Sequence, residues 1–351
     1  MFKELNLEDI ENVEIKANKF LDEGVALISK NSNYNINKVK SLRNEIELEF
    51  KNKGYPMQIE LNEIENINIH KKIYNLFANK ELKEFLDNLS LKLNGSPVTI
   101  FPSIHIMRNY LSGPHFGMHG WHSDSLGERP YDFCFKRLKS KNYLFGKISI
   151  ALQKNTKIGG NIDIAKATFK NYGQIANRQI IANQLQAKYL RIFKKSFPLS
   201  IKRFDSWFTD LFALITNPKS INPNPYDIVA FHSQLFHRGT PPSPKGWQEI
   251  LKSNHSAVIN KEGLSKNINL KKKNKFIIYA HFGNLIGVES YLYDRSRRIY
   301  NWEKNQNEKR CWLKQYKLDL FSDIYPESNK LFDKALKKNM RIFKILLFIG
   351  I

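Results

Sequence analysis

The chain has 351 residues, of which 42% are hydrophobic and 13% aromatic, so it is long enough to bury a substantial core. Its net charge of +23 favours anionic partners, but the basic residues are spread along the chain, which argues against a dedicated nucleic-acid surface. Two cysteines, Cys134 and Cys311, exclude a disulfide framework and indicate a cytoplasmic protein. The longest apolar run, ILLFIGI, is far shorter than the roughly 20 residues of a transmembrane helix. We expect no transmembrane segment, and at most weak contact of this C-terminal tail with a membrane surface.

The first part of the chain, residues 1–95, is expected to be mainly helical. Apolar residues recur at helical spacing between Leu7 and Leu21, with Asn6 as the expected N-cap and Gly24 as the stop. The sequence VALIS that follows predicts a short strand. Residues 36–51 and 68–91 again have helical periodicity.

From about residue 97 the sequence predicts β-structure. Short β-branched and aromatic segments are separated by Gly, Pro and Asn, which is typical of an antiparallel sandwich or barrel. These segments are VTIFPSIHIMRNYL, NYLFGKISIAL, NIDIA, DIVAFHS and KFIIYAHFG. We expect a single domain over residues 1–351, mainly β with flanking helices (α+β). Its parts are a β core at 96–165 and 204–286, a helical insertion at 166–203 and a helical C-terminal extension at 287–351.

The sequence GMHGWHSDS predicts part of a metal site. In a strand, residues i and i+2 point to the same face, so His122 and Asp124 would lie side by side. A third ligand has to come from elsewhere, and DIVAFHSQLFHRG offers His232 and His237. Two imidazoles and one carboxylate with open positions suit non-haem Fe(II) and O₂, whereas zinc favours Cys or a third His. The alternative is that these are polar residues at the mouth of a barrel without a metal.

Several segments resemble the phytanoyl-CoA dioxygenase-like family of Fe(II)- and 2-oxoglutarate-dependent oxygenases, which includes ectoine hydroxylase. The resemblance covers about residues 14–50 and 96–285 and is strongest in WHSD and FHSQLFHRG. It implies a double-stranded β-helix core of the jelly-roll or cupin-like kind. It further implies Fe(II), 2-oxoglutarate and O₂, with His122, Asp124 and His237 as the metal ligands and catalytic centre. His232 would then be a core residue or a neighbour of the metal ligands, while His115 and His119 would be structural or lie on the substrate side.

The resemblance also predicts where 2-oxoglutarate binds. The family places an Arg at the start of the last core strand, and here that position is Lys275, which cannot make the bidentate contact of Arg. Lys147 in KISIAL is the alternative cation, because it shares a strand face with Ser149 and Ala151. Asn109 resembles the asparagine that helps to bind 2-oxoglutarate in ectoine hydroxylase.

The predicted function is hydroxylation of an unactivated C–H bond of a small anionic biosynthetic intermediate, and no specific nucleic acid is expected as a partner. His105, Trp121 and Tyr131 are candidate pocket residues, and Arg238 and Lys245 follow His237 as cations that would attract an anion. Asp124 argues against halogenation, because halogenases of this type lack the carboxylate. The alternative is a metal-free, basic β-barrel that binds nucleic acid or an anionic glycan, with residues 291–304 as its nearest candidate surface.

Overall fold

The computed structural model describes residues 12–29, 36–56, 58–109, 143–153, 162–165, 219–239 and 275–289, and six positions between 325 and 337. Its helices are α1 (Val13–Glu23), α2 (Ile36–Asn52), α3 (Ile67–Phe77) and α4 (Lys80–Lys92), with a short 3₁₀ helix, η2, at Leu61–Glu63. None of these helices is long and apolar enough to cross a membrane.

Helix α1 begins later than its sequence predicts. The expected N-cap Asn6 is wrong, because the helix begins at Val13 and the Asn12 side chain accepts a hydrogen bond from the Glu14 amide at 3.1 Å. The expected stop is confirmed: Gly24 has φ 80°, a conformation that glycine adopts without steric cost.

Residues 68–91, which the sequence predicts to be helical, form most of two helices, α3 and α4. Asn79 separates them, and its side chain accepts a hydrogen bond from the Leu82 amide at 3.1 Å, which caps α4. The periodicity runs through the break because the two helices bury similar faces in the same core.

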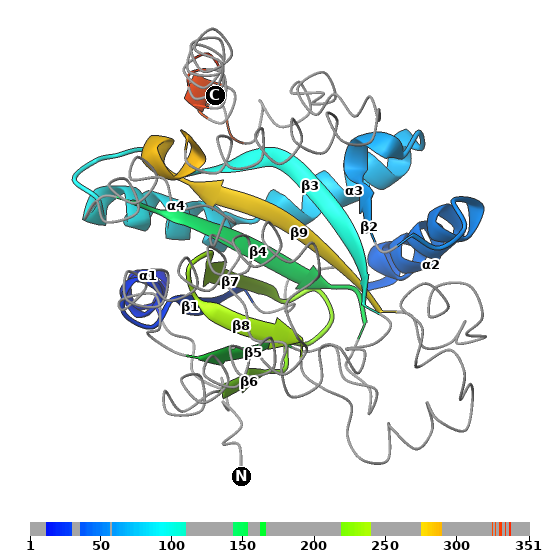
Figure 1. Ribbon diagram of the computed structural model, residues 1–351, viewed down its shortest axis with the longest axis horizontal. Coiled ribbons are helices and arrows are strands. Elements are labelled where there is room, and N and C mark those ends of the chain that lie inside the picture. The colour runs from blue at the N-terminus through cyan, green and yellow to red at the C-terminus, as the bar shows by residue number, and fades with distance from the viewer. Residues whose placement is uncertain are drawn as a thin grey trace, which may run out of the picture.

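The strands form two antiparallel sheets (Figure 1). The large sheet has the order β1-β7-β4-β9-β3-β2, and the small sheet has the order β6-β5-β8. The large-sheet strands are β1 (Val25–Ser29), β2 (Gln58–Glu60), β3 (Thr99–Asn109), β4 (Phe145–Ala151), β7 (Ile228–His232) and β9 (Lys275–Gly283). The small-sheet strands are β5 (Ile162–Ala165), β6 (Lys219–Ile221) and β8 (Phe236–Gly239).

The chain alternates between the two sheets from β4 onward: β5 and β6 lie in the small sheet, β7 in the large, β8 in the small and β9 in the large. This alternation is the topology of a double-stranded β-helix, so the expected fold class is confirmed. Two strands of the N-terminal region, β1 and β2, extend the large sheet at its two edges.

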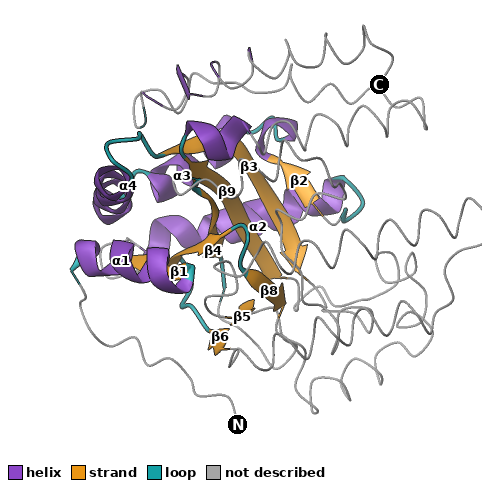
Figure 2. Cartoon of the chain, turned by 60° about the vertical axis from the view of Figure 1, so that its left-hand side comes forward, coloured by secondary structure: helices purple, strands orange, loops and turns teal. Residues whose placement is uncertain are grey.

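The large sheet has an apolar core on each face. Its outer face packs against α1–α4, which share one continuous core with it (Figure 2). The C-terminal part of the chain joins this core through Tyr325, whose hydroxyl donates to the Phe77 carbonyl at 2.7 Å. A smaller core lies on the inner face, between the sheets, and consists of Val25, Ile162, Ile164, Ile221, Val229, Phe231, Leu235, Ile277 and Tyr279.

Candidate functional site

The two candidate histidines of DIVAFHSQLFHRG lie on different sheets. Strand β7 ends at His232, a three-residue turn follows, and β8 begins at Phe236. The turn carries the chain from the large sheet to the small one. As a result, His232 and His237 face different cores although only four residues separate them.

His232 belongs to the helix-covered core. It shares the face of Ile228 and Ala230 on β7, and its ring lies 6.1 Å from the rings of both Phe20 and Tyr143. Its Nδ1 accepts a hydrogen bond from the Gln234 amide at 3.2 Å. Burial lowers the pKa of His232 to about 3, because a charged imidazole would lose its hydration there. It is therefore a neutral structural side chain that fixes the turn.

His237 belongs to the space between the sheets. It lies opposite Ile164 on β5, is 7% exposed, and has its ring 5.0 Å from the ring of Phe231. Its Nδ1 lies 3.0 Å from the Leu235 carbonyl, to which it donates a hydrogen bond. With the proton on Nδ1, the lone pair is on Nε2. A neutral imidazole fixed in this way through its other nitrogen is typical of metal ligands.

Lys275 is the first residue of β9 and lies opposite Asn109, the last residue of β3. The register therefore brings together two of the three positions that the sequence suggests for the co-substrate. The Lys275 side chain is on the inner face, in step with Ile277 and Tyr279, and is only 3% exposed. Burial lowers its pKa to about 8, since the ammonium group is largely removed from water.

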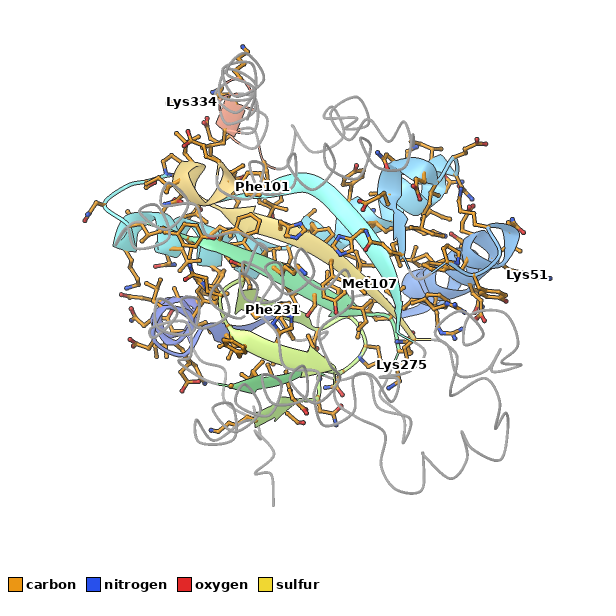
Figure 3. The ribbon with its side chains drawn as sticks, viewed as in Figure 1. Lys51, Phe101, Met107, Phe231, Lys275 and Lys334 are labelled. Carbon is orange, nitrogen blue, oxygen red and sulfur yellow. The ribbon has the colours of Figure 1, made fainter. Side chains whose placement is uncertain are left out.

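Lys147, the third of these positions, also lies on the inner face but at the other end of β9. It is opposite His281 on β9 and Phe231 on β7. Its Nζ is 5.5 Å from the centroid of the Tyr279 ring, a cation–π distance that holds the half-buried ammonium over the inner face. Figure 3 shows Lys275 and Phe101, which is opposite His281, near opposite ends of the large sheet.

His105, one of the candidate pocket residues, is buried on the inner face of β3. Its ring stacks on Tyr279, with centroids 5.3 Å apart, and lies 5.6 Å from the ring of His281. Tyr279 and His281 were not predicted as site residues. The sequence of β9 could have predicted them, because every second residue after Lys275 lies on the same face of the strand.

Arg238 is on β8, opposite Asp163 of β5. The other predicted site residues lie outside the described residues. These are His115, His119, Trp121, His122, Asp124, Tyr131 and Lys245. Within the described ranges, no three His, Cys, Asp or Glu side chains form a group that could hold a metal ion. The described part of the chain thus contributes one candidate ligand, His237.

Comparison with known proteins gives structural matches only. No protein-family model matches the chain, and no curated protein matches it. Among similar solved structures, the epimerase SnoN in complex with Fe³⁺, α-ketoglutarate and nogalamycin RO has a TM-score of 0.43 at 10% identity, over 78% of this chain and 84% of SnoN. The α-ketoglutarate-dependent carbocyclase SnoK has a TM-score of 0.43 at 11% identity, over 81% of this chain and 87% of SnoK. EctD from S. alaskensis with 2-oxoglutarate and 5-hydroxyectoine has a TM-score of 0.41 at 11% identity, over 81% of this chain and 87% of EctD. At this degree of similarity, function has to be argued from the chain's own residues.

Proposed function

We propose that the chain is an Fe(II)- and 2-oxoglutarate-dependent dioxygenase that hydroxylates an unactivated C–H bond of a small anionic intermediate. The observation that carries the proposal is that the inner faces of the double-stranded β-helix carry both a fixed imidazole and a buried cation. His237 from the small sheet and Lys275 from the large sheet are both buried on inner faces, where a barrel of this kind holds a small ligand.

The proposed iron ligands are His122, Asp124 and His237. Because Nδ1 donates to the Leu235 carbonyl, Nε2 is the nitrogen of His237 that would bind the metal. In the described part of the chain, β8 is the end strand of the small sheet and pairs with β5 alone. For the three side chains to share one ion, the segment with His122 and Asp124 has to come next to β8.

We assign the distal carboxylate of 2-oxoglutarate to Lys275, assisted by Asn109 on the neighbouring strand. A buried ammonium forms a stronger ion pair than an exposed one, because less water screens it. The bound anion in turn favours the protonated lysine and offsets its lowered pKa. The single ammonium replaces the bidentate contact of Arg, so orientation of the co-substrate depends more on its metal-bound end.

When bound, iron with 2-oxoglutarate and O₂ supplies the oxidising chemistry that replaces a C–H hydrogen by hydroxyl. The protein's own residues orient the reactants and exclude water. Apolar side chains from both sheets surround the inner space and keep it poor in competing hydrogen donors. The buried residues on these faces include Ile162, Ile164, Val229, Phe231 and Ile277.

The proposal predicts that the purified apo-protein binds one Fe(II) per chain. Adding 2-oxoglutarate without O₂ should then produce a metal-to-ligand charge-transfer band in the visible spectrum. His237→Ala, His122→Ala and Asp124→Ala should each abolish stoichiometric iron binding, since two ligands hold the metal poorly. Iron content measured by metal analysis, with circular dichroism as a check on folding, tests this.

The matched control is His232→Phe, at the histidine five positions before His237. This variant keeps the aromatic packing against Phe20 but removes the imidazole, so it should bind iron normally even if it is less stable. Unchanged iron stoichiometry in His237→Ala, or loss of iron in a folded His232→Phe, contradicts the assignment. A wild-type protein without stoichiometric iron supports the binding-module alternative.

A further inference from the structure

The inner face of the large sheet has a second cationic position, surrounded by rings. Lys147 on β4 lies over Tyr279 of β9, and Tyr279 stacks on His105 of β3. His105 lies 5.6 Å from His281, which stacks on Phe145 at 5.5 Å and an interplanar angle of 15°. The four rings are between 3% and 8% exposed. We call Lys147 together with these four rings the lysine–ring cluster.

The lysine–ring cluster lies close to the candidate iron ligand. Phe231 links the two, because it lies opposite Lys147 in the register of β4 and β7, while its ring is 5.0 Å from the ring of His237. A ligand held by Lys147 would therefore have its remaining atoms near His237. That is where the oxidised carbon of a substrate has to lie under the proposed function.

The backbone of Lys147 on β4 and that of Lys275 lie at separate positions along the length of β9. In the register of the sheet, Lys147 lies opposite His281. His281 is six residues from Lys275 along β9, so their backbones are about 20 Å apart at roughly 3.3 Å per residue. The terminal carbons of 2-oxoglutarate are only about 5 Å apart, from four C–C bonds of about 1.5 Å. The backbone positions of the two lysines are thus much farther apart than the two ends of 2-oxoglutarate, and we assign the lysines to two sites.

We propose that the lysine–ring cluster binds the oxyanion group of the substrate, a carboxylate or a phosphate. Lys147 supplies the charge, and the Tyr279 hydroxyl and the imidazoles of His105 and His281 are the groups around it that can donate hydrogen bonds. Low exposure strengthens such charge-assisted contacts and gives them directional specificity. The inference rests on the proposed function in one respect, since it leaves Lys275 to the co-substrate.

Calorimetric titration of two full-length variants with three ligands tests the inference. Inorganic phosphate and acetate probe the substrate site and distinguish phosphate from carboxylate, and 2-oxoglutarate with Fe(II) under argon probes the co-substrate site. Lys147→Met should weaken the tighter of the two oxyanions about tenfold to a hundredfold and leave 2-oxoglutarate affinity within about twofold. Lys275→Met, the matched control on the same sheet face, should show the reverse pattern.

The outcomes separate this inference from the proposed function. Oxyanion affinity that Lys147→Met does not change, or equal loss of the same ligand in both variants, overturns the inference. Failure of 2-oxoglutarate to bind the iron-loaded wild type overturns the proposed function, while the oxyanion titrations still report on Lys147. If Lys147→Met does not fold, competition in the wild type decides: simultaneous binding of oxyanion and 2-oxoglutarate supports two sites, and mutual exclusion overturns them.

Discussion

Lys275 is a buried cation of the candidate site. Lys275 is 3% exposed among the apolar side chains of the inner face, and its pKa falls from 10.5 to about 8. Removing the ammonium from bulk water costs free energy, because protein groups replace its hydration only in part. A residue that destabilises the empty protein and is favoured by an anion is typical of a binding site.

We expect Lys275→Met to stabilise the apo-protein in a pH-dependent way. Since the folded pKa of about 8 lies below the unfolded value of 10.5, the unfolded chain holds more protons between these values, and the free energy of unfolding of the wild type rises with pH there. Below pH 8 the penalty is complete. The variant should therefore be more stable by on the order of 1–3 kcal/mol at pH 7, and lose most of this advantage by pH 10.5.

Urea unfolding at pH 7 and pH 10 measures this difference. Lys80→Met on α4 is the matched control, because the Lys80 side chain is 90% exposed and its removal should change the stability little at either pH. An equal stability difference at the two pH values for Lys275→Met would show that burial of the charge is not its cause.

The start of β4 is held by a close contact between elements. The Leu144 carbonyl accepts a hydrogen bond from the Asn284 amide at 3.1 Å, and Asn284 Oδ1 accepts from the Gly287 amide at 3.1 Å. This packs the helical turn at 285–289 directly onto the strand that carries Lys147. A Cβ on Gly287 would lie 2.0 Å from the Leu144 carbonyl oxygen, so only glycine allows this approach.

Gly287→Ala should therefore lower the free energy of unfolding by about 2–3 kcal/mol, because backbone atoms on both sides have to move. Gly95→Ala is a suitable control. Gly95 has φ 74° and no atom within 4 Å of its added Cβ, so only the strained backbone contributes and the loss should be about 1 kcal/mol. Thermal or urea unfolding compares the two variants, and equal losses would show that the close contact is unimportant.

In the whole molecule, the two apolar cores have different roles. The large core between the helices and the outer sheet face supplies most of the buried apolar surface, and it draws on residues from Ala17 to Tyr325. The inner core is smaller, and the polar groups of the proposed sites lie on the same face of the large sheet or opposite it on the small sheet. Stability thus depends mainly on one face of the large sheet, which leaves the other face available for ligands.

The charge of +23 leads to a prediction for the whole chain. We expect weak, sequence-independent association with duplex DNA that disappears near physiological ionic strength, because the basic residues form no long cluster. Fluorescence anisotropy of a labelled duplex measures this affinity between about 20 and 200 mM salt, the range over which such contacts become screened. Tight binding at the higher salt would instead indicate a nucleic-acid partner, and competition by 2-oxoglutarate would indicate that the nucleic acid is a substrate.

Much of the fold follows from local sequence. Alternating β-branched residues, Gly and Asn stops and helical periodicity correctly predict β1, β3, β4, β5, β7, β9 and α2, because these signals act within a few residues. The same periodicity gave the wrong start for α1 and missed the break at Asn79. Caps are side-chain contacts at single positions, and several asparagines nearby offer similar caps.

The candidate site was predictable only as a set of residue types. The sequence determines that His232, His237, Lys147 and Lys275 are present on strand-like segments, and a resemblance to a family ranks them. Only the tertiary structure decides which face each one occupies. The turn after His232 moves the chain to another sheet, so His232 lies against the helices and His237 lies between the sheets. The register of β9 against β3 and β4 places Lys275 beside Asn109 and Lys147 beside His281. These pairings are set by hydrogen bonds between strands far apart in sequence, and no local pattern encodes them.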